Sequence, residues 1–74
     1  MKALLTTFAR ALVDQPERVR VDEYDGGELL ELSVADADRG AVIGRRGRTA
    51  DALRTLLDAA ARRRGRRCEL EILG

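Results

Sequence analysis

The spacing of the apolar residues changes three times along this chain, and these changes limit the folds that it can form. Residues 3–14 have the spacing of an amphipathic helix, and residues 18–22 and 28–34 alternate with the period of two that is typical of strands. Helical spacing returns over residues 48–64, and residues 67–73 alternate again. A chain with this order needs a fold in which helices and a small sheet share one core.

The first helical segment, residues 3–14, is predicted to pack one stripe against the core. Apolar residues at helical spacing form this stripe: Leu4, Leu5, Phe8, Ala9 and Leu12. Phe8 lies in the middle of the stripe, and we therefore expect it to be buried. Pro16 ends the helix, because the residue before a proline avoids the helical region.

Two strands joined by a tight turn are predicted next. Residues 18–22 alternate as a half-buried strand should, and Asp25-Gly26-Gly27 supplies the positive-φ residues of a hairpin turn. The return strand, residues 28–34, places three apolar side chains on one face: Leu30, Leu32 and Val34.

Two helices separated by a glycine-bounded turn follow the hairpin. Asp36 is the predicted N-cap of a short helix over residues 37–43, which Gly40 is expected to break early. After the turn, a long helix is predicted over residues 48–64, with Gly65 as the C′ residue that ends it. Its apolar stripe consists of Leu53, Leu56, Leu57 and Ala60.

The last strand, residues 67–73, places Cys68, Leu70 and Ile72 on the apolar face. Cys68 is therefore predicted to pack as a small core residue, and the alternative is a reactive thiol. A strand that follows two helices cannot return as a simple hairpin, so we predict parallel pairing in part of the sheet. The predicted fold class is α+β in the order α-β-β-α-α-β, with a three-stranded mixed sheet covered on one face by helices.

Charge is divided unevenly between the two halves, although the formal net charge is only +1. Residues 1–38 carry four basic and nine acidic side chains, a balance of −5. Residues 39–74 carry ten arginines and four acidic side chains, a balance of +6. Such asymmetry points to binding of a polyanion, and the alternative is a solvated arginine-rich surface.

Several function classes are disfavoured by what the chain lacks. With no histidine and one cysteine, it can form neither a zinc cluster nor an internal disulfide. It has no apolar run of about 18 residues and no signal-peptide pattern, so we expect a cytoplasmic protein without a membrane span. We expect no cofactor and no enzymatic activity, because the single serine, Ser33, lies on a strand and no carboxylate pair is held in a pocket.

The turn Gly44-Arg45-Arg46-Gly47 is the most informative stretch. Its glycines let the backbone turn sharply and leave no Cβ to block an approaching chain. The long helix begins directly afterwards, so the positive end of its dipole lies beside Arg45, Arg46 and Arg48. This combination suits the phosphates of a nucleic-acid strand. The alternative is an ordinary corner between helices with arginines that face solvent.

Val42-Ile43-Gly44-Arg45-Arg46-Gly47, followed by an amphipathic helix, resembles the KH domain, whose GXXG loop clamps a four-nucleotide single strand. The element order resembles the type II form of bacteria, and the resemblance covers residues 1–74 as a single domain. It implies a single-stranded RNA-binding protein, a post-transcriptional regulator or RNA chaperone linked to cell elongation and division. This loop has arginine at both middle positions, where many relatives carry a lysine.

The resemblance also implies which residues bind RNA. The glycine-bounded loop would meet the sugar–phosphate backbone, Ile43 would form part of an apolar floor under the bases, and the start of the long helix would add phosphate contacts. The RNA-binding candidates are Ile43, Gly44, Arg45, Arg46, Gly47, Arg48 and Thr49.

Two protein partners are implied by the resemblance as well: a second copy of the chain, and a second KH protein, KhpB (also called Jag or EloR). On the long helix, Ala52, Leu56 and Ala59 reach beyond the main stripe. They are either filler with high helix propensity or a seam that faces a partner. The alternative function is therefore a protein-interaction or dimerisation module with the KH fold and only incidental RNA contact.

A second basic cluster, residues 62–67, lies at the far end of the long helix, about 20 Å from the glycine loop at 1.5 Å per residue. The cluster either stays solvated or contacts an extended RNA, and the sequence leaves both alternatives open.

Overall fold

The computed structural model describes residues 1–74 and contains three helices and three strands. They follow the chain as α1 (Lys2–Leu12), β1 (Arg20–Tyr24), β2 (Leu29–Ser33), α2 (Arg39–Ile43), α3 (Arg48–Arg62) and β3 (Glu69–Ile72). This is the predicted order α-β-β-α-α-β. None of the three helices combines the length and the apolarity that crossing a bilayer requires.

The three strands form one mixed sheet in the order β1-β2-β3. β1 and β2 are antiparallel, with Val21 opposite Leu32, whereas β2 and β3 are parallel, with Leu30 opposite Leu70. The parallel pairing is possible because α2 and α3 carry the chain from the end of β2 back to the start of β3. The predicted fold class is therefore confirmed.

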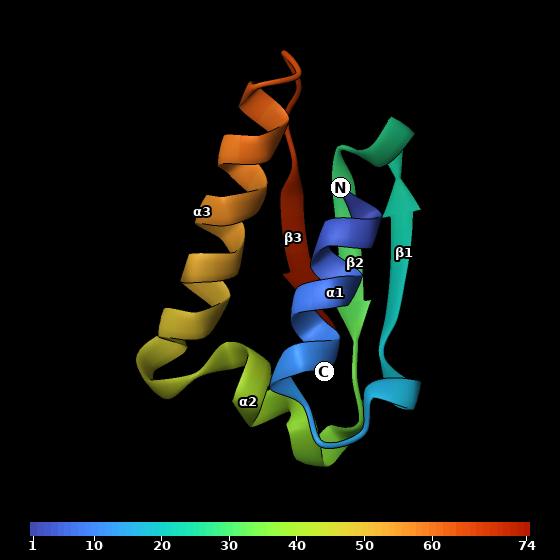
Figure 1. Ribbon diagram of the computed structural model, residues 1–74, viewed down its shortest axis with the longest axis vertical. Coiled ribbons are helices and arrows are strands. Elements are labelled where there is room, and N and C mark those ends of the chain that lie inside the picture. The colour runs from blue at the N-terminus through green and yellow to red at the C-terminus, as the bar shows by residue number, and fades with distance from the viewer.

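The core lies between the sheet and the helices. Figure 1 shows α1 across the sheet, α3 alongside β3, and α2 at the lower end, where it connects to α3. Fully buried side chains from the middle strand and all three helices meet there: Leu5, Leu30, Leu32, Val42 and Leu57. Leu70 is buried as well, and Cys68 and Ile72 are partly buried against the same core, as the alternation of the last strand predicts.

Two predictions about helical stripes are wrong in detail. On α1, Leu5 and Ala9 are buried, whereas Phe8 is 41% exposed and Leu12 is 40% exposed. On α3, the buried residues are Ala50, Leu53, Leu57 and Ala61, and Leu56 is exposed. In both helices two neighbouring rows of side chains are apolar, and the sheet covers only one of them.

The first strand begins later than its alternation suggests. Residues Pro16–Arg18 form a 3-10 turn, and β1 starts only at Arg20. Pro16 lies at the start of this turn, where its missing N–H costs no hydrogen bond. The hairpin turn itself is where it was predicted, with φ of 67° at Gly26 and 92° at Gly27.

Asp36 is not the N-cap of the short helix. Its side chain is fully exposed and lies 3.9 Å from Arg39, in a 3-10 turn over Asp36–Asp38. Asp38 precedes α2 but caps no helical N–H; its carboxylate accepts hydrogen bonds from the backbone N–H groups of Asp14 (3.2 Å) and Gln15 (3.0 Å). The predicted early break at Gly40 is also wrong, because Gly40 lies inside α2.

The C-terminal end of α3 is capped as predicted. Gly65 has a φ of 65°, the N–H of Gly65 donates to the carbonyl of Arg62, and the N–H of Arg66 donates to the carbonyl of Ala61. This pair of bonds is a Schellman motif with Gly65 at C′. It ends the helix and turns the chain toward β3.

Candidate nucleic-acid interface

The predicted loop is a tight turn that joins two helices. The N–H of Gly44 donates to the carbonyl of Gly40 and closes α2, and the N–H of Gly47 donates to the carbonyl of Gly44 at 3.1 Å. Three loop residues have positive φ: 77° at Gly44, 58° at Arg46 and 73° at Gly47. The backbone thus reverses within four residues, and both glycines are at positions that favour glycine.

Gly44 also allows a close approach between the loop and the next helix. A Cβ at this position would lie 2.7 Å from the Cβ of Thr49 and 2.8 Å from its backbone nitrogen. No such contact would occur at Gly47, where a Cβ would meet nothing within 4 Å. The first turn of α3 therefore packs directly on the loop, and the positive end of the helix dipole lies next to it.

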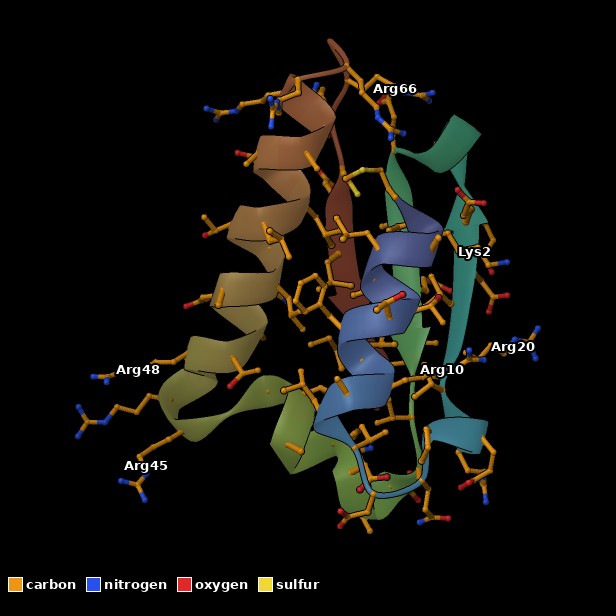
Figure 2. The ribbon with its side chains drawn as sticks, viewed as in Figure 1. Lys2, Arg10, Arg20, Arg45, Arg48 and Arg66 are labelled. Carbon is orange, nitrogen blue, oxygen red and sulfur yellow. The ribbon has the colours of Figure 1, made fainter.

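The arginines in and directly after the loop form no ion pairs. Arg45, Arg46 and Arg48 are exposed, and none of the ion pairs in the structure involves them. In Figure 2, Arg45 and Arg48 extend away from the body of the molecule at the lower end of α3. Three arginines without carboxylate partners, beside a helix N-terminus, form a surface that attracts phosphates.

The remaining predicted residues lie in the same place. Ile43, the last residue of α2, is 39% exposed, so its side chain is accessible directly before the loop. Thr49 is half-buried in the first turn of α3, against Gly44. The structure therefore brings all seven predicted residues together around one turn between α2 and α3.

An open groove of about 490 Å³ lies between α3 and β3. Its lining residues are Arg54, Thr55, Asp58, Cys68, Glu69 and Leu70. The sequence analysis singled out none of the three groove residues of α3. The sequence carries no local signal for them, because the groove is formed by residues of α3 together with residues of β3 more than ten positions later.

Arg54 is held in place at the edge of this groove. Its Nε donates to the carbonyl of Leu70 at 3.4 Å, and one terminal nitrogen lies 3.5 Å from a carboxylate oxygen of Asp51. The guanidinium thereby links α3 to β3. A side chain held in this way presents its remaining N–H groups to the groove with little loss of rotamer entropy.

Cys68 forms part of the same groove, where it is half-buried. Burial raises the pKa of the Cys68 thiol, so the neutral thiol is favoured. The predicted packing of Cys68 against the core is confirmed.

Comparisons with known proteins agree with one another. The family model described as "KhpA/KhpB, KH domain" matches residues 2–72. The RNA-binding protein KhpA of Halalkalibacterium halodurans is 52% identical over 99% of this chain and 99% of that protein. The RNA-binding proteins KhpA of Clostridium acetobutylicum and Treponema pallidum are 48% and 50% identical over 99% and 95% of this chain, and over 100% and 90% of their own lengths. No solved structure matches the chain significantly.

The names of these relatives describe RNA binding and no reaction. They agree with the expectation that the chain is not an enzyme.

Proposed function

Because the chain belongs to the KhpA/KhpB family of KH domains, we propose that it is a single KH domain that binds single-stranded RNA with its GXXG loop. The observation that carries the proposal is the loop geometry: Gly44 and Gly47 both have positive φ, and three unpaired arginines lie between them and directly after them. KH domains clamp four nucleotides with such a loop.

Each loop residue has a physical role in this proposal. Gly47 lets the RNA backbone approach the protein backbone closely, because a Cβ there would point into open space, and Gly44 keeps the loop packed against Thr49. Arg45, Arg46 and Arg48 neutralise phosphates, and Thr49 adds a hydroxyl donor at the start of α3. Ile43 supplies an apolar surface for a base, since its side chain is exposed beside the loop.

We also propose that the chain forms a homodimer. The two neighbouring helices α1 and α3 expose large apolar side chains that the core does not use: Phe8, Leu12 and Leu56. Ala52 and Ala59 are exposed on α3 as well and let a second copy approach closely. A single four-nucleotide groove is small, so pairing two domains raises the affinity for a longer RNA.

The wider role is part of the same proposal, and the family resemblance supports it. The chain acts in the cytoplasm as a post-transcriptional regulator or RNA chaperone linked to cell elongation and division. KhpB (Jag or EloR) is a second partner, and the name of the matching family joins KhpA and KhpB.

A second candidate function is a protein-interaction module with only incidental RNA contact. The observation in its favour is the same exposed apolar surface on α1 and α3. The two functions are distinguished by removing the loop charge while the helices stay intact.

The test is the double variant Arg45→Asp and Arg46→Asp, assayed for binding of single-stranded RNA and for oligomeric state. Aspartate tolerates the positive φ of Arg46 better than most residues, so the fold is retained. The matched control is Arg10→Asp with Arg18→Asp, which makes the same change in charge away from the loop.

The proposal expects the loop variant to lose RNA binding while it remains a normal dimer, and the control variant to bind RNA more tightly than the loop variant does. Equal RNA binding by the loop variant and the wild-type chain contradicts the proposal and favours the interaction module.

A further inference from the structure

Five arginines gather at the opposite end of α3 from the loop. This group, the arginine turn, comprises Arg62, Arg63, Arg64, Arg66 and Arg67, and every one of them is exposed. The same segment contains Gly65, whose positive φ completes the Schellman motif. The turn is therefore a fixed structural element and not a loose end of the helix.

Arg66 anchors this turn to the rest of the molecule. Its guanidinium donates a hydrogen bond to the backbone carbonyl of Gly26 in the hairpin between β1 and β2. A Cβ at Gly26 would lie 3.6 Å from the same guanidinium nitrogen, an ordinary van der Waals contact, so the positive φ of 67° and not the approach of Arg66 favours glycine there. Figure 2 places Arg66 at the upper end of the molecule, far from Arg45 and Arg48.

The other arginines of the turn form few ion pairs with the rest of the chain. Arg62 pairs with Asp58 at 3.1 Å, and this is the only ion pair that the turn makes. Arg64, Arg66 and Arg67 line a cavity of about 210 Å³ beside the hairpin, together with a single carboxylate, Glu23.

Most of the acidic groups near this end lie beside one arginine of the turn. Arg67 shares a shallow depression with Asp25, Glu28 and Glu69. Arg63 has no carboxylate partner at all, and Arg64 faces only the cavity that contains Glu23. Positive charge therefore remains in excess along the end of α3.

The arginine turn and the proposed RNA site lie at the two ends of the same face of α3. Arg48, Thr55 and Arg62 are seven residues apart, so they follow one face of α3, and the groove between α3 and β3 lies beside that face. The axial distance from Arg48 to Arg62 is about 21 Å at 1.5 Å per residue. A strand that leaves the loop along this groove reaches the arginine turn.

Between the loop and the arginine turn, the groove beside α3 contains acidic side chains, whereas both ends of the helix are basic. Asp58 and Glu69 line the groove, and carboxylates repel the phosphates of a passing strand. Carboxylates can accept hydrogen bonds from the amino groups of bases, and a guanidinium such as that of Arg54, which lines the same groove, can donate to base acceptors. This charge order suits a strand whose phosphates are held at both ends and whose bases face the groove.

We propose that the arginine turn is a second phosphate-binding site, which holds the backbone of a single-stranded nucleic acid longer than the four nucleotides gripped by the GXXG loop. The inference rests on the proposed function, because the strand enters at the loop. Binding is then stronger for a long RNA than for a short one within a single protein chain.

The test compares two labelled RNA probes of mixed sequence, one of four and one of twelve nucleotides, over a range of salt concentrations. Neutralising about three phosphates at the loop gives a slope of log K against log salt near −2 for the short probe. About three further contacts at the arginine turn give a slope near −4 for the long probe.

The decisive variant is Arg62→Gln, Arg63→Gln and Arg64→Gln, which leaves Gly65 and the anchor Arg66 unchanged. It is expected to bind the short probe like the wild-type chain, to bind the long probe about tenfold more weakly, and to return the long-probe slope to about −2. The matched control, Arg10→Gln with Arg18→Gln and Arg20→Gln, removes the same charge on the other side of the molecule and keeps the slope near −4.

A charge-preserving variant, Arg62→Lys with Arg63→Lys and Arg64→Lys, guards against an effect of misfolding and is expected to keep most of the long-probe affinity. If the glutamine variant keeps the full gain for the long probe, or if the wild-type chain shows no gain, the second site is refuted while the proposed function stands. If the wild-type chain binds neither probe, the proposed function fails and this inference fails with it.

Discussion

Gly44 and Thr49 are in such close contact that no side chain fits between them. A Cβ on Gly44 would lie 2.7 Å from the Cβ of Thr49 and 2.8 Å from its backbone nitrogen. Gly44 also has φ 77° and ψ 171°, a combination that is essentially restricted to glycine. The contact fixes the loop against the first turn of α3, and with it the arginines that we propose bind phosphate.

The variant Gly44→Ala is expected to lower the free energy of unfolding by more than the backbone strain alone, which is about 1–3 kcal/mol, because the new methyl group also displaces Thr49. The variant Gly47→Ala, at φ 73° with open space around it, is the matched control and is expected to cost only about 1–2 kcal/mol. Urea unfolding measures both. Equal losses from the two substitutions would show that the contact with Thr49 has no energetic weight.

Asp38 is the one buried charged side chain of the core, with 3% of its surface exposed. It connects the segment after α1 to the start of α2 through the N–H groups of Asp14 and Gln15. Asp38→Ala leaves both N–H groups without this partner, and the free energy of unfolding is expected to fall by about 1–3 kcal/mol.

The control for this prediction is Asp36→Ala, two residues earlier, where the carboxylate is fully exposed and 3.9 Å from Arg39. It is expected to change stability by no more than about 0.5 kcal/mol. Thermal or urea unfolding measures the free energy of unfolding of both variants. A larger decrease for Asp36→Ala than for Asp38→Ala would contradict the roles given to the two carboxylates.

Tyr24, the single tyrosine, lies on β1 near two carboxylates of the sheet. The negative charge of Glu31, then desolvation and then the charge of Asp22 raise its pKa above the usual value, while Arg20 acts in the opposite direction. Because the folded chain holds this proton more tightly, the contribution of Tyr24 to stability declines as the pH rises above the ordinary pKa of tyrosine.

The tyrosinate absorbance measures this titration directly, because the chain has no tryptophan. The midpoint is expected to lie above that of the unfolded chain in urea and to fall in Glu31→Gln, whose side chain is neutral. A midpoint that Glu31→Gln leaves unchanged would rule out Glu31 as the main cause.

Leu56 is the exposed leucine in the middle of α3, with 37% of its surface accessible. If α1 and α3 form the proposed dimer surface, Leu56→Asp places a charge in that interface and gives a monomer that still folds. Light scattering after gel filtration reports the mass. Leu73→Asp is the control, since Leu73 is also 37% exposed but follows β3 and belongs to neither helix. A dimer that survives Leu56→Asp places the interface elsewhere.

Much of the fold could be predicted from the sequence because the local signals agree with one another. Alternation identified β2 and β3, the glycines at residues 26 and 27 identified the hairpin, and Gly65 identified the end of α3. These signals depend on backbone conformation within a few residues, and the fold preserves them.

The burial of individual helical residues could not be predicted in the same way. Leu5 and Phe8 belong to neighbouring rows on α1, and helical spacing alone places both on one apolar face. Contact with the sheet buries Leu5 and leaves Phe8 exposed. The same reason explains the exposure of Leu56, and it also produces the apolar surface available to a second copy.

The candidate site also contains residues that the sequence could predict and one that it could not. The loop residues are contiguous, so one motif found them all, and the structure keeps them together. Arg54 belongs to the groove only because Leu70, sixteen residues later, returns beside it in β3. No local pattern contains that information, because it arises from the parallel pairing of β2 and β3.

The central claim is that RNA binds at the GXXG loop, and a two-dimensional ¹H–¹⁵N NMR titration of the wild-type chain with a four-nucleotide single-stranded RNA tests it most directly. The largest amide shifts are expected at Ile43 and in the loop through Thr49, with the open face of the sheet (Asp22, Glu31 and Glu71) nearly unchanged. Shifts concentrated on that acidic face, or none at the loop while the RNA binds, would contradict it.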